Sequence, residues 1–192
     1  MLSKRKVEER KARQDQILNG ALSVFKTHGI EKTTMDEIAN ESGFGKATLY
    51  YYYGSKDEVF VAIMEKGWKN LWEAIESKIV EEKNPRNKFI GIVKKMGITV
   101  KADSNLYGFL FTAPNYIQDT NQQTWQTYQE RLYAILKSIL DEGIKQNEFV
   151  NMDTGILMKA IGGIFHELFI NSKDDINEGD IELMLNNLLN SK

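Results

Sequence analysis

The stretch GFGKATLYYYYGSKDE, residues 43–58, decides the fold, and it raises the question of why four tyrosines stand in a row. At about 100° per residue along a helix, Leu49 and Tyr53 share one face and should pack inward. The three tyrosines between them, 50–52, then reach outward. A small core does not need tyrosines on three faces of one helix, so these residues indicate a binding surface. The alternative is an aromatic cluster that stabilises the core, and for Tyr53 we expect that role.

The residues before this stretch predict a helix-turn-helix. TTMDEIANESG, residues 33–43, offers Thr34 as an N-cap, with Glu37 three residues later to complete a capping box. Gly43 is suited to the left-handed conformation that ends a short helix. A tight turn then leads into a second helix from about Lys46 to Tyr53. Two short helices joined in this way form the unit that places a recognition helix in the major groove of DNA.

Apolar residues recur at three- and four-residue steps through the rest of the chain, which predicts an all-α fold. A first helix over 14–28 ends before Gly29, and a long helix begins at Ser55, with Glu58 as a second capping box. No strand alternation or internal repeat interrupts this pattern. Further helices are expected at 85–100, 107–111, 125–140, 153–171 and 179–190, with a break at Pro114. We expect a DNA-binding domain over 1–54 and an effector-binding and dimerisation domain over 55–192.

Composition excludes several classes of protein. The chain has 192 residues, of which 42% are hydrophobic and 27% charged, and it has no cysteine and only two histidines. Disulfides and thiolate metal sites are therefore ruled out. No segment approaches the roughly 18 uncharged apolar residues of a membrane span, and no signal-peptide segment follows the basic start. We expect a cytoplasmic protein that does not bind a membrane.

An enzyme finds little support in the sequence. HELF, residues 166–169, lacks the second histidine of a zinc motif, and there is no glycine-rich phosphate loop or serine elbow. We therefore expect no catalytic residue, no metal and no cofactor. His166 is interpreted as a hydrogen-bonded helix residue that faces a pocket.

The formal charge of −2 hides an uneven distribution. Residues 1–56 carry ten Lys and Arg against seven acids, whereas the remainder carries 15 against 20. A basic N-terminal surface on an acidic body fits a partner such as DNA, although a solvated charged face explains so small a difference equally well. The basic residues of the start, Lys4 to Lys11, either reach an adjacent groove or backbone or form a disordered tail.

The ordered set of motifs over 14–60 resembles the TetR family of one-component bacterial transcription regulators. The resemblance rests on a first helix ending in HG, then TTMDEIANESG, then KATLYYYYGSKDEVF. Two positions depart from the family pattern: Phe44 stands where a smaller aliphatic residue is usual, and Gly45 where a serine often caps the recognition helix. Residues 61–192 resemble the family only in helix order and length.

The resemblance implies roles for individual residues. Contacts to DNA phosphates are implied for Thr34, Thr48, Tyr50, Tyr52 and Lys56. Base edges would be faced by Lys46, Ala47 and Tyr51, with a contribution from Tyr50. Elementary chemistry agrees for Lys56, because a positive charge at a helix N-terminus reinforces the attraction of its free amides for anions.

The C-terminal region carries more large side chains than a thin bundle needs, and some of them are expected to line a cavity for an apolar or aromatic effector. Core packing remains the alternative for each residue. The predicted effector-binding residues are Trp72, Met96, Phe111, Trp125, Tyr128 and His166. The last two helices offer a wide apolar face that a two-fold homodimer would bury, unless they close the core of the monomer itself.

Together these observations predict a transcriptional regulator that binds a double-stranded DNA operator. We expect a repressor that a small-molecule effector releases from a palindromic operator. The alternative is an effector- or protein-binding helical module without operator-specific DNA binding.

Overall fold

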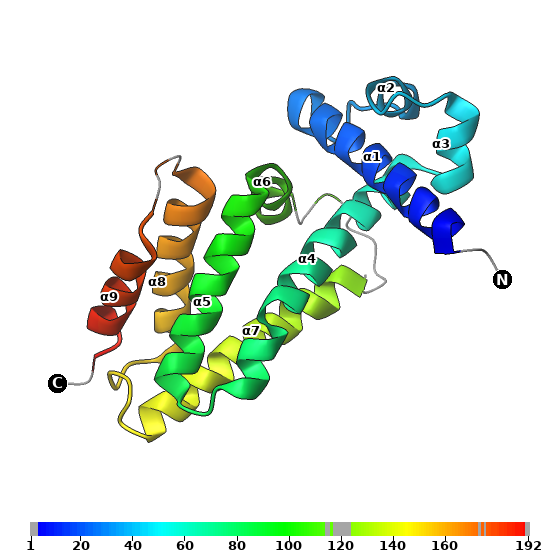
Figure 1. Cartoon of the computed structure of the whole chain (residues 1–192). Helices are drawn as coiled ribbons and strands as arrows, with labels where there is room; N and C mark the ends of the chain where they lie inside the picture. Colours follow the sequence, from blue (N-terminus) through cyan, green and yellow to red (C-terminus); the bar gives the residue numbers. More distant parts are fainter. Residues whose placement is uncertain (1–3, 114–115, 117–123, 173, 175, 191–192) are drawn as a thin grey trace. The chain divides into compact units, whose positions relative to one another are not determined.

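The computed structural model describes residues 4–113, 116, 124–172, 174 and 176–190, and every regular element within them is helical. The chain divides into two compact units (Figure 1). The first unit contains the chain up to Gly67 and the segment that begins at Phe109, and the second contains Trp68–Gly108 and the chain from helix α7 onward. These units are defined by packing, so the functional division between residues 54 and 55 stays a prediction.

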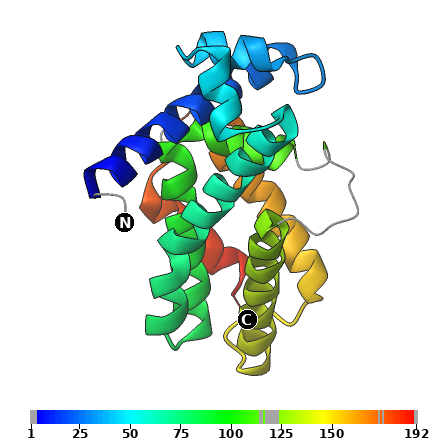
Figure 2. The ribbon, with the colours of Figure 1, turned by 90° about the vertical axis from the view of Figure 1, so that its right-hand side faces the viewer.

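Helix α1 (Lys4–His28) forms the edge of the first unit and runs unbroken from its N-terminal end (Figure 2). It begins ten residues before the predicted start at residue 14. Of the two alternatives for Lys4 to Lys11, the disordered tail is therefore wrong, and a contact with DNA stays a prediction. The first turns of α1 are charged and bury no apolar residue, so the sequence shows no apolar periodicity there. They are helical because Lys, Arg and Glu are good helix formers. The helix ends at Gly29, whose φ of +78° is the predicted stop.

Helices α2 (Met35–Glu41), α3 (Lys46–Tyr52) and the first half of α4 (Lys56–Glu81) complete the first unit. Their core includes the predicted apolar face of α1 and the buried side chains of Ile38 and Leu49. Helix α6 (Ser104–Thr112) adds Phe109, whose ring stacks on Phe25 with centroids 5.8 Å apart. Phe109 also meets Phe60 of α4 edge-on at 5.9 Å. An aromatic cluster from three helices thus supports the helix-turn-helix.

Helix α5 (Pro85–Ala102) is the centre of the second unit. It packs against α7 (Thr124–Lys145), α9 (Glu178–Leu188) and the π-helical turn η1 (His166–Asn171). Pro85 is its first residue and Asn84 its cap, as expected at a helix start. The apolar residues of this helix recur at three- and four-residue steps and are buried: Phe89, Ile92, Val93, Met96 and Val100.

The helix predicted over 153–171 is present but not uniform. It consists of α8 (Thr154–Phe165), which packs on α7, followed by the π-helical turn η1. The rings of Phe165 and Phe169 lie 4.7 Å apart, and Phe169 occupies the space beside Gly97 of α5. Pro114 lies outside the described residues. None of the described helices is long and apolar enough to cross a membrane.

Candidate nucleic-acid interface

The first element of the candidate interface is the N-terminus of α2, which is fixed by the predicted capping box. Thr34 Oγ1 accepts a hydrogen bond from the Glu37 backbone N–H, and the Glu37 carboxylate accepts one from the Thr34 backbone N–H at 2.7 Å. The Thr34 hydroxyl also donates to Glu37 at 2.9 Å. These bonds lower the pKa of Glu37 below its ordinary value. A phosphate that takes the Thr34 hydroxyl as donor must therefore displace Glu37.

The turn between α2 and α3 is held by backbone bonds. Gly43 has a φ of +71°, as predicted, and the Phe44 N–H donates to the Ala39 carbonyl at 2.9 Å. Gln16 of α1 adds a long-range bond, because its side-chain amide donates to the Ser42 carbonyl at 2.8 Å. Gly45 is the N-cap of α3 and supplies no side-chain bond. The departure from the family pattern at Gly45 thus leaves the helix start uncapped while the turn itself is fixed.

Helix α3 presents Tyr50 and Tyr51 outward as the helical wheel predicts, whereas Tyr52 reaches outward only in part. Leu49 is fully buried and Tyr53 nearly so, which raises the pKa of Tyr53 to about 12 because burial disfavours the phenolate. Tyr51 is 70% exposed and Tyr50 47% exposed, whereas Tyr52 is half-buried. Two rings on the outer face are therefore available to a partner.

Lys46, at the start of α3, is engaged by an acid that sequence reasoning did not consider. Its Nζ lies 2.7 Å from a carboxylate oxygen of Asp36 on α2, and this contact raises the pKa of Lys46. Both side chains are more than half exposed, so the ion pair is easily exchanged for another partner. Lys46 must leave Asp36 before it reaches a base edge.

Lys56, at the start of α4, is also tethered. Its Nζ donates to the backbone carbonyl of Glu31 at 2.9 Å and lies 6.0 Å from the centre of the Tyr116 ring. Next to it, Ser55 Oγ accepts from the Glu58 N–H and the Glu58 carboxylate accepts from the Gly54 N–H. The cation thus stands at a capped helix start. Ala47 is exposed and Thr48 half-buried, so the predicted DNA-contacting residues of α3 and their neighbours at the starts of α2 and α4 are all at least partly accessible.

The predicted effector-binding residues are divided between the two units. Phe111 belongs to the first unit, whereas the other five belong to the second. Trp72 is committed to protein contacts, because the Arg131 guanidinium lies 4.1 Å from its ring centre. Met96 and Trp125 are buried, and Tyr128 and His166 are half-buried. Contact with an effector stays a prediction for these four residues.

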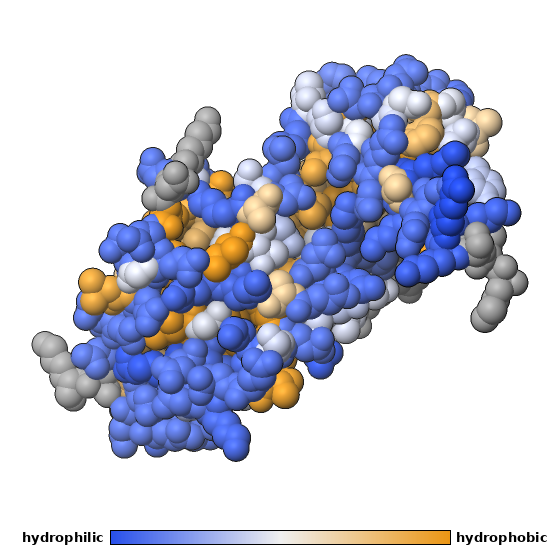
Figure 3. Space-filling model, in the orientation of Figure 1, coloured by the Kyte–Doolittle hydropathy of each residue, from blue (hydrophilic) through white to orange (hydrophobic). Residues whose placement is uncertain are grey.

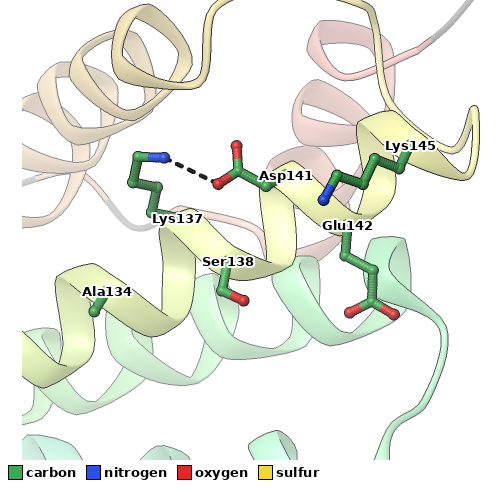
Figure 4. A pocket seen from close by; sticks show the side chains of 6 residues that line it. All are labelled: Ala134, Lys137, Ser138, Asp141, Glu142 and Lys145. Carbon is green, nitrogen blue, oxygen red and sulfur yellow. Dashed lines mark hydrogen bonds and ion pairs between the residues drawn. The ribbon is translucent and has the colours of Figure 1, made fainter.

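A depression of about 380 Å³ on the second unit involves other residues. Its lining residues all lie on α7, and Figure 4 shows Lys137 and Asp141 joined by an ion pair across one turn of that helix. The lining is Ala134, Lys137, Ser138, Asp141, Glu142 and Lys145. Such a charged surface does not suit an apolar effector.

Two features of the first unit escaped sequence reasoning. Arg10 of α1 lies beside the rings of Tyr51 and Tyr52, and Asp36 pairs with Lys46. Both are contacts between helices, and the spacing of residues along one helix carries no signal for them. The spacing of ten residues between Asp36 and Lys46 becomes meaningful only once a helix-turn-helix is assumed.

An all-helical chain that presents a capped helix-turn-helix with exposed tyrosines and basic residues is a DNA-binding regulator. Residues 17–63 match the family described as bacterial regulatory proteins, tetR family. The chain is 27% identical, over 80% of its length and 82% of the relative, to the uncharacterized HTH-type transcriptional regulator YfiR of Bacillus subtilis. It is 22% identical to the fatty acid metabolism regulator protein of the same organism, with 84% of each chain covered.

A solved structure shares the fold. The structure of AibR in complex with isovaleryl coenzyme A and operator DNA superimposes with a TM-score of 0.79 at 18% identity, covering 92% of this chain and 97% of that one. Residues 17–63 thus carry the DNA-binding region of the tetR family, and the curated relatives named here are transcriptional regulators.

Proposed function

We propose that the protein is a repressor that binds a near-palindromic operator as a homodimer and leaves it when a small apolar effector binds. The observation that carries the proposal is the outer face of α3, where Tyr50 and Tyr51 stand exposed on a helix held by a fixed turn. Tyrosine suits DNA, because its hydroxyl reaches phosphate oxygens while its ring packs on sugars or thymine methyls.

A second copy of this chain is the proposed partner of the C-terminal helices. Ile156 of α8 is 58% exposed and Leu183 of α9 is 61% exposed, and Leu188 is exposed as well. Gly162 and Gly163 are open to solvent, with no atom near the position of a side chain, so another helix is free to approach closely. Figure 3 shows apolar side chains at several points on the surface of this unit. A two-fold dimer would bury this face and pair two recognition helices.

The proposed effector binds in the second unit and carries a hydrogen-bond acceptor. Trp125 is 2% exposed, and its indole N–H has no hydrogen-bond partner among the described residues. A buried donor without an acceptor is costly, and a carbonyl or carboxylate on the effector would satisfy it. The names of the relatives, one concerned with fatty acid metabolism and one bound to isovaleryl coenzyme A, support an acyl compound.

The proposed coupling between effector and operator runs through α4 and α6. Each of these helices contributes residues to both units. Lys56 stands at the DNA end of α4, and Phe109 of α6 packs on Phe25 and Phe60 beneath the helix-turn-helix. An effector that shifts either helix would change the separation of two recognition helices in a dimer. Effector and operator would then weaken each other's binding, typically by about 5- to 150-fold.

The experiment is to sequence the genomic fragments that the purified protein retains, to footprint them, and then to titrate compounds against the complex. Two half-sites about 34 to 36 Å apart, or a multiple of that distance, are expected. A single half-site would refute the dimer. Acyl compounds are expected to release the DNA, and an effector that binds without changing operator affinity would refute the coupling.

The alternative module without operator-specific binding predicts a different outcome of the same experiment. Such a protein would retain fragments at random or none at all. The outer side of α3, which is predicted to face the bases, is exposed, and this favours operator-specific binding over the alternative.

A further inference from the structure

The first turns of α1 form a basic segment beside the recognition helix. Between Lys4 and Arg13 the chain has six basic residues and two acids. At about 100° per residue, Lys6, Arg10 and Arg13 share one face of α1, and Lys11 lies about a quarter turn away from Arg10. Figure 3 shows strongly hydrophilic side chains, in dark blue, gathered on the first unit.

Arg10 contacts two tyrosines of α3 at once. Its guanidinium carbon lies 5.9 Å from the ring centre of Tyr51 and 5.9 Å from that of Tyr52. The two rings stand edge to face, 5.2 Å apart and 86° to each other. A guanidinium is attracted to the faces of aromatic rings at such distances, so this contact holds the charge of Arg10 beside both tyrosines and restrains the two rings.

The hydrogen-bonding capacity of Arg10 is unused. Among the described residues Arg10 has no hydrogen bond and no ion pair, although a guanidinium offers five N–H donors. The other two cations of the interface are occupied, since Lys46 pairs with Asp36 and Lys56 donates to the Glu31 carbonyl. Of Arg10, Lys46 and Lys56, Arg10 is therefore the cation that can take an anion without first releasing a hydrogen-bond or ion-pair partner among the described residues.

We propose that Arg10 donates to a phosphate of the DNA backbone and acts as a positioning residue for Tyr51 and Tyr52. The proposal rests on the proposed function and deepens it, because it adds α1 to a DNA surface otherwise formed by α2, α3 and α4. A planar guanidinium matches the geometry of a phosphate, and its contact with the two rings reduces the freedom that it loses on binding one. The restrained ring of Tyr51, the most exposed tyrosine of α3, then meets the bases in one orientation.

The test measures the dissociation constant of operator and of random duplex over a range of salt concentrations. Arg10→Ala is expected to lower the slope of log K against log salt by about 0.9, the value of one phosphate contact. Between about 50 mM and 200 mM salt this variant should lose roughly 3.5-fold less affinity than the parent protein. Arg10→Lys should keep the salt slope, because it keeps the charge. It should narrow the ratio of operator to random affinity, because a lysine is shorter than an arginine, binds aromatic rings less well and has no planar fork for a phosphate.

Lys11→Ala is the matched control, since it removes one positive charge from the same helix away from the two rings. For Lys11→Ala, the slope of log K against log salt is expected to change less than for Arg10→Ala. The ratio of operator to random affinity is expected to stay the same. Equal effects of the two alanine variants would overturn the phosphate contact. An unchanged ratio in Arg10→Lys would overturn the positioning role. Failure of the parent protein to prefer any duplex would instead refute the proposed function. Arg10 is exposed, so circular dichroism should show all variants folded.

Discussion

Replacing Gly20 with alanine tests how closely α1 and α2 pack beneath the candidate interface. Gly20 is buried in α1, and a methyl group at this position would lie 2.8 Å from both the backbone nitrogen and the Cβ of Ser42. Real side chains do not come so close, and a backbone atom cannot turn aside as a flexible side chain does. Either α1 or the C-terminus of α2 must therefore move.

The expected cost follows from two opposing effects. Overpacking typically costs about 1 to 3 kcal/mol, and a contact with backbone belongs in the upper half of that range. Alanine in a helix interior gains about 1 kcal/mol over glycine. The net destabilisation of the first unit is thus roughly 1 to 2 kcal/mol. Operator affinity should fall as well, because the same movement displaces Ser42 and the turn that positions α3.

Hydrogen exchange is the suitable assay, because a chain of two compact units has no single free energy of unfolding. Amides of α1 and α2 should exchange about 5 to 30 times faster in the variant, and those of α5 should be unchanged. Gly91→Ala is the control, since the nearest atom to its methyl group would be Lys78 Cδ at 3.9 Å. This change should stabilise α5 by up to about 1 kcal/mol. Unchanged or slower exchange in Gly20→Ala would refute the reasoning.

Four further predictions concern the site. Asp36→Asn should strengthen binding to operator and to random DNA, because it removes a negative charge and the ion pair that Lys46 must leave; fluorescence anisotropy measures both affinities, and weaker binding would contradict the prediction. Lys56→Ala should weaken all duplexes alike and reduce the salt slope by about 1, whereas a changed base preference would argue for a base contact. Because the pKa of Glu37 is lowered in the folded state, its stabilisation of α2 should be complete above the ordinary glutamate pKa and disappear as the pH falls through the lowered value. Glu37→Gln should remove this pH dependence of α2 exchange, and its persistence would assign it to another group. Trp125→Phe should weaken effector binding by about 1 kcal/mol without changing operator affinity, as measured by effector titration, and an unaltered effector affinity would exclude the indole N–H as donor.

Local features were predictable from the sequence because they depend on residues a few positions apart. The capping box of Thr34 and Glu37 joins positions three apart, and the left-handed Gly43 follows from its lack of a side chain. The inward Leu49 and Tyr53 follow from helical periodicity. The buried stripe of α5 has the same origin.

The residues of the effector site could not be predicted from the periodicity of apolar residues. An apolar or aromatic residue on a helix face has the same spacing whether it fills a core or lines a cavity. Trp72 illustrates this, because its ring is covered by Arg131 from another helix, 59 positions later in the chain. Trp125 is distinguished by a buried N–H without a described acceptor, which only the packed structure reveals.

The sequence by itself determined the all-helical class, the helix-turn-helix and the outward face of its recognition helix, because each is encoded in spacings of three and four residues. The tertiary structure decided which charges are available on that face. It places Asp36 against Lys46, the Glu31 carbonyl against Lys56, and Arg10 against Tyr51 and Tyr52. These partners are brought together by the packing of separate helices, and the strength of a charge contact depends on distances that no single helix fixes.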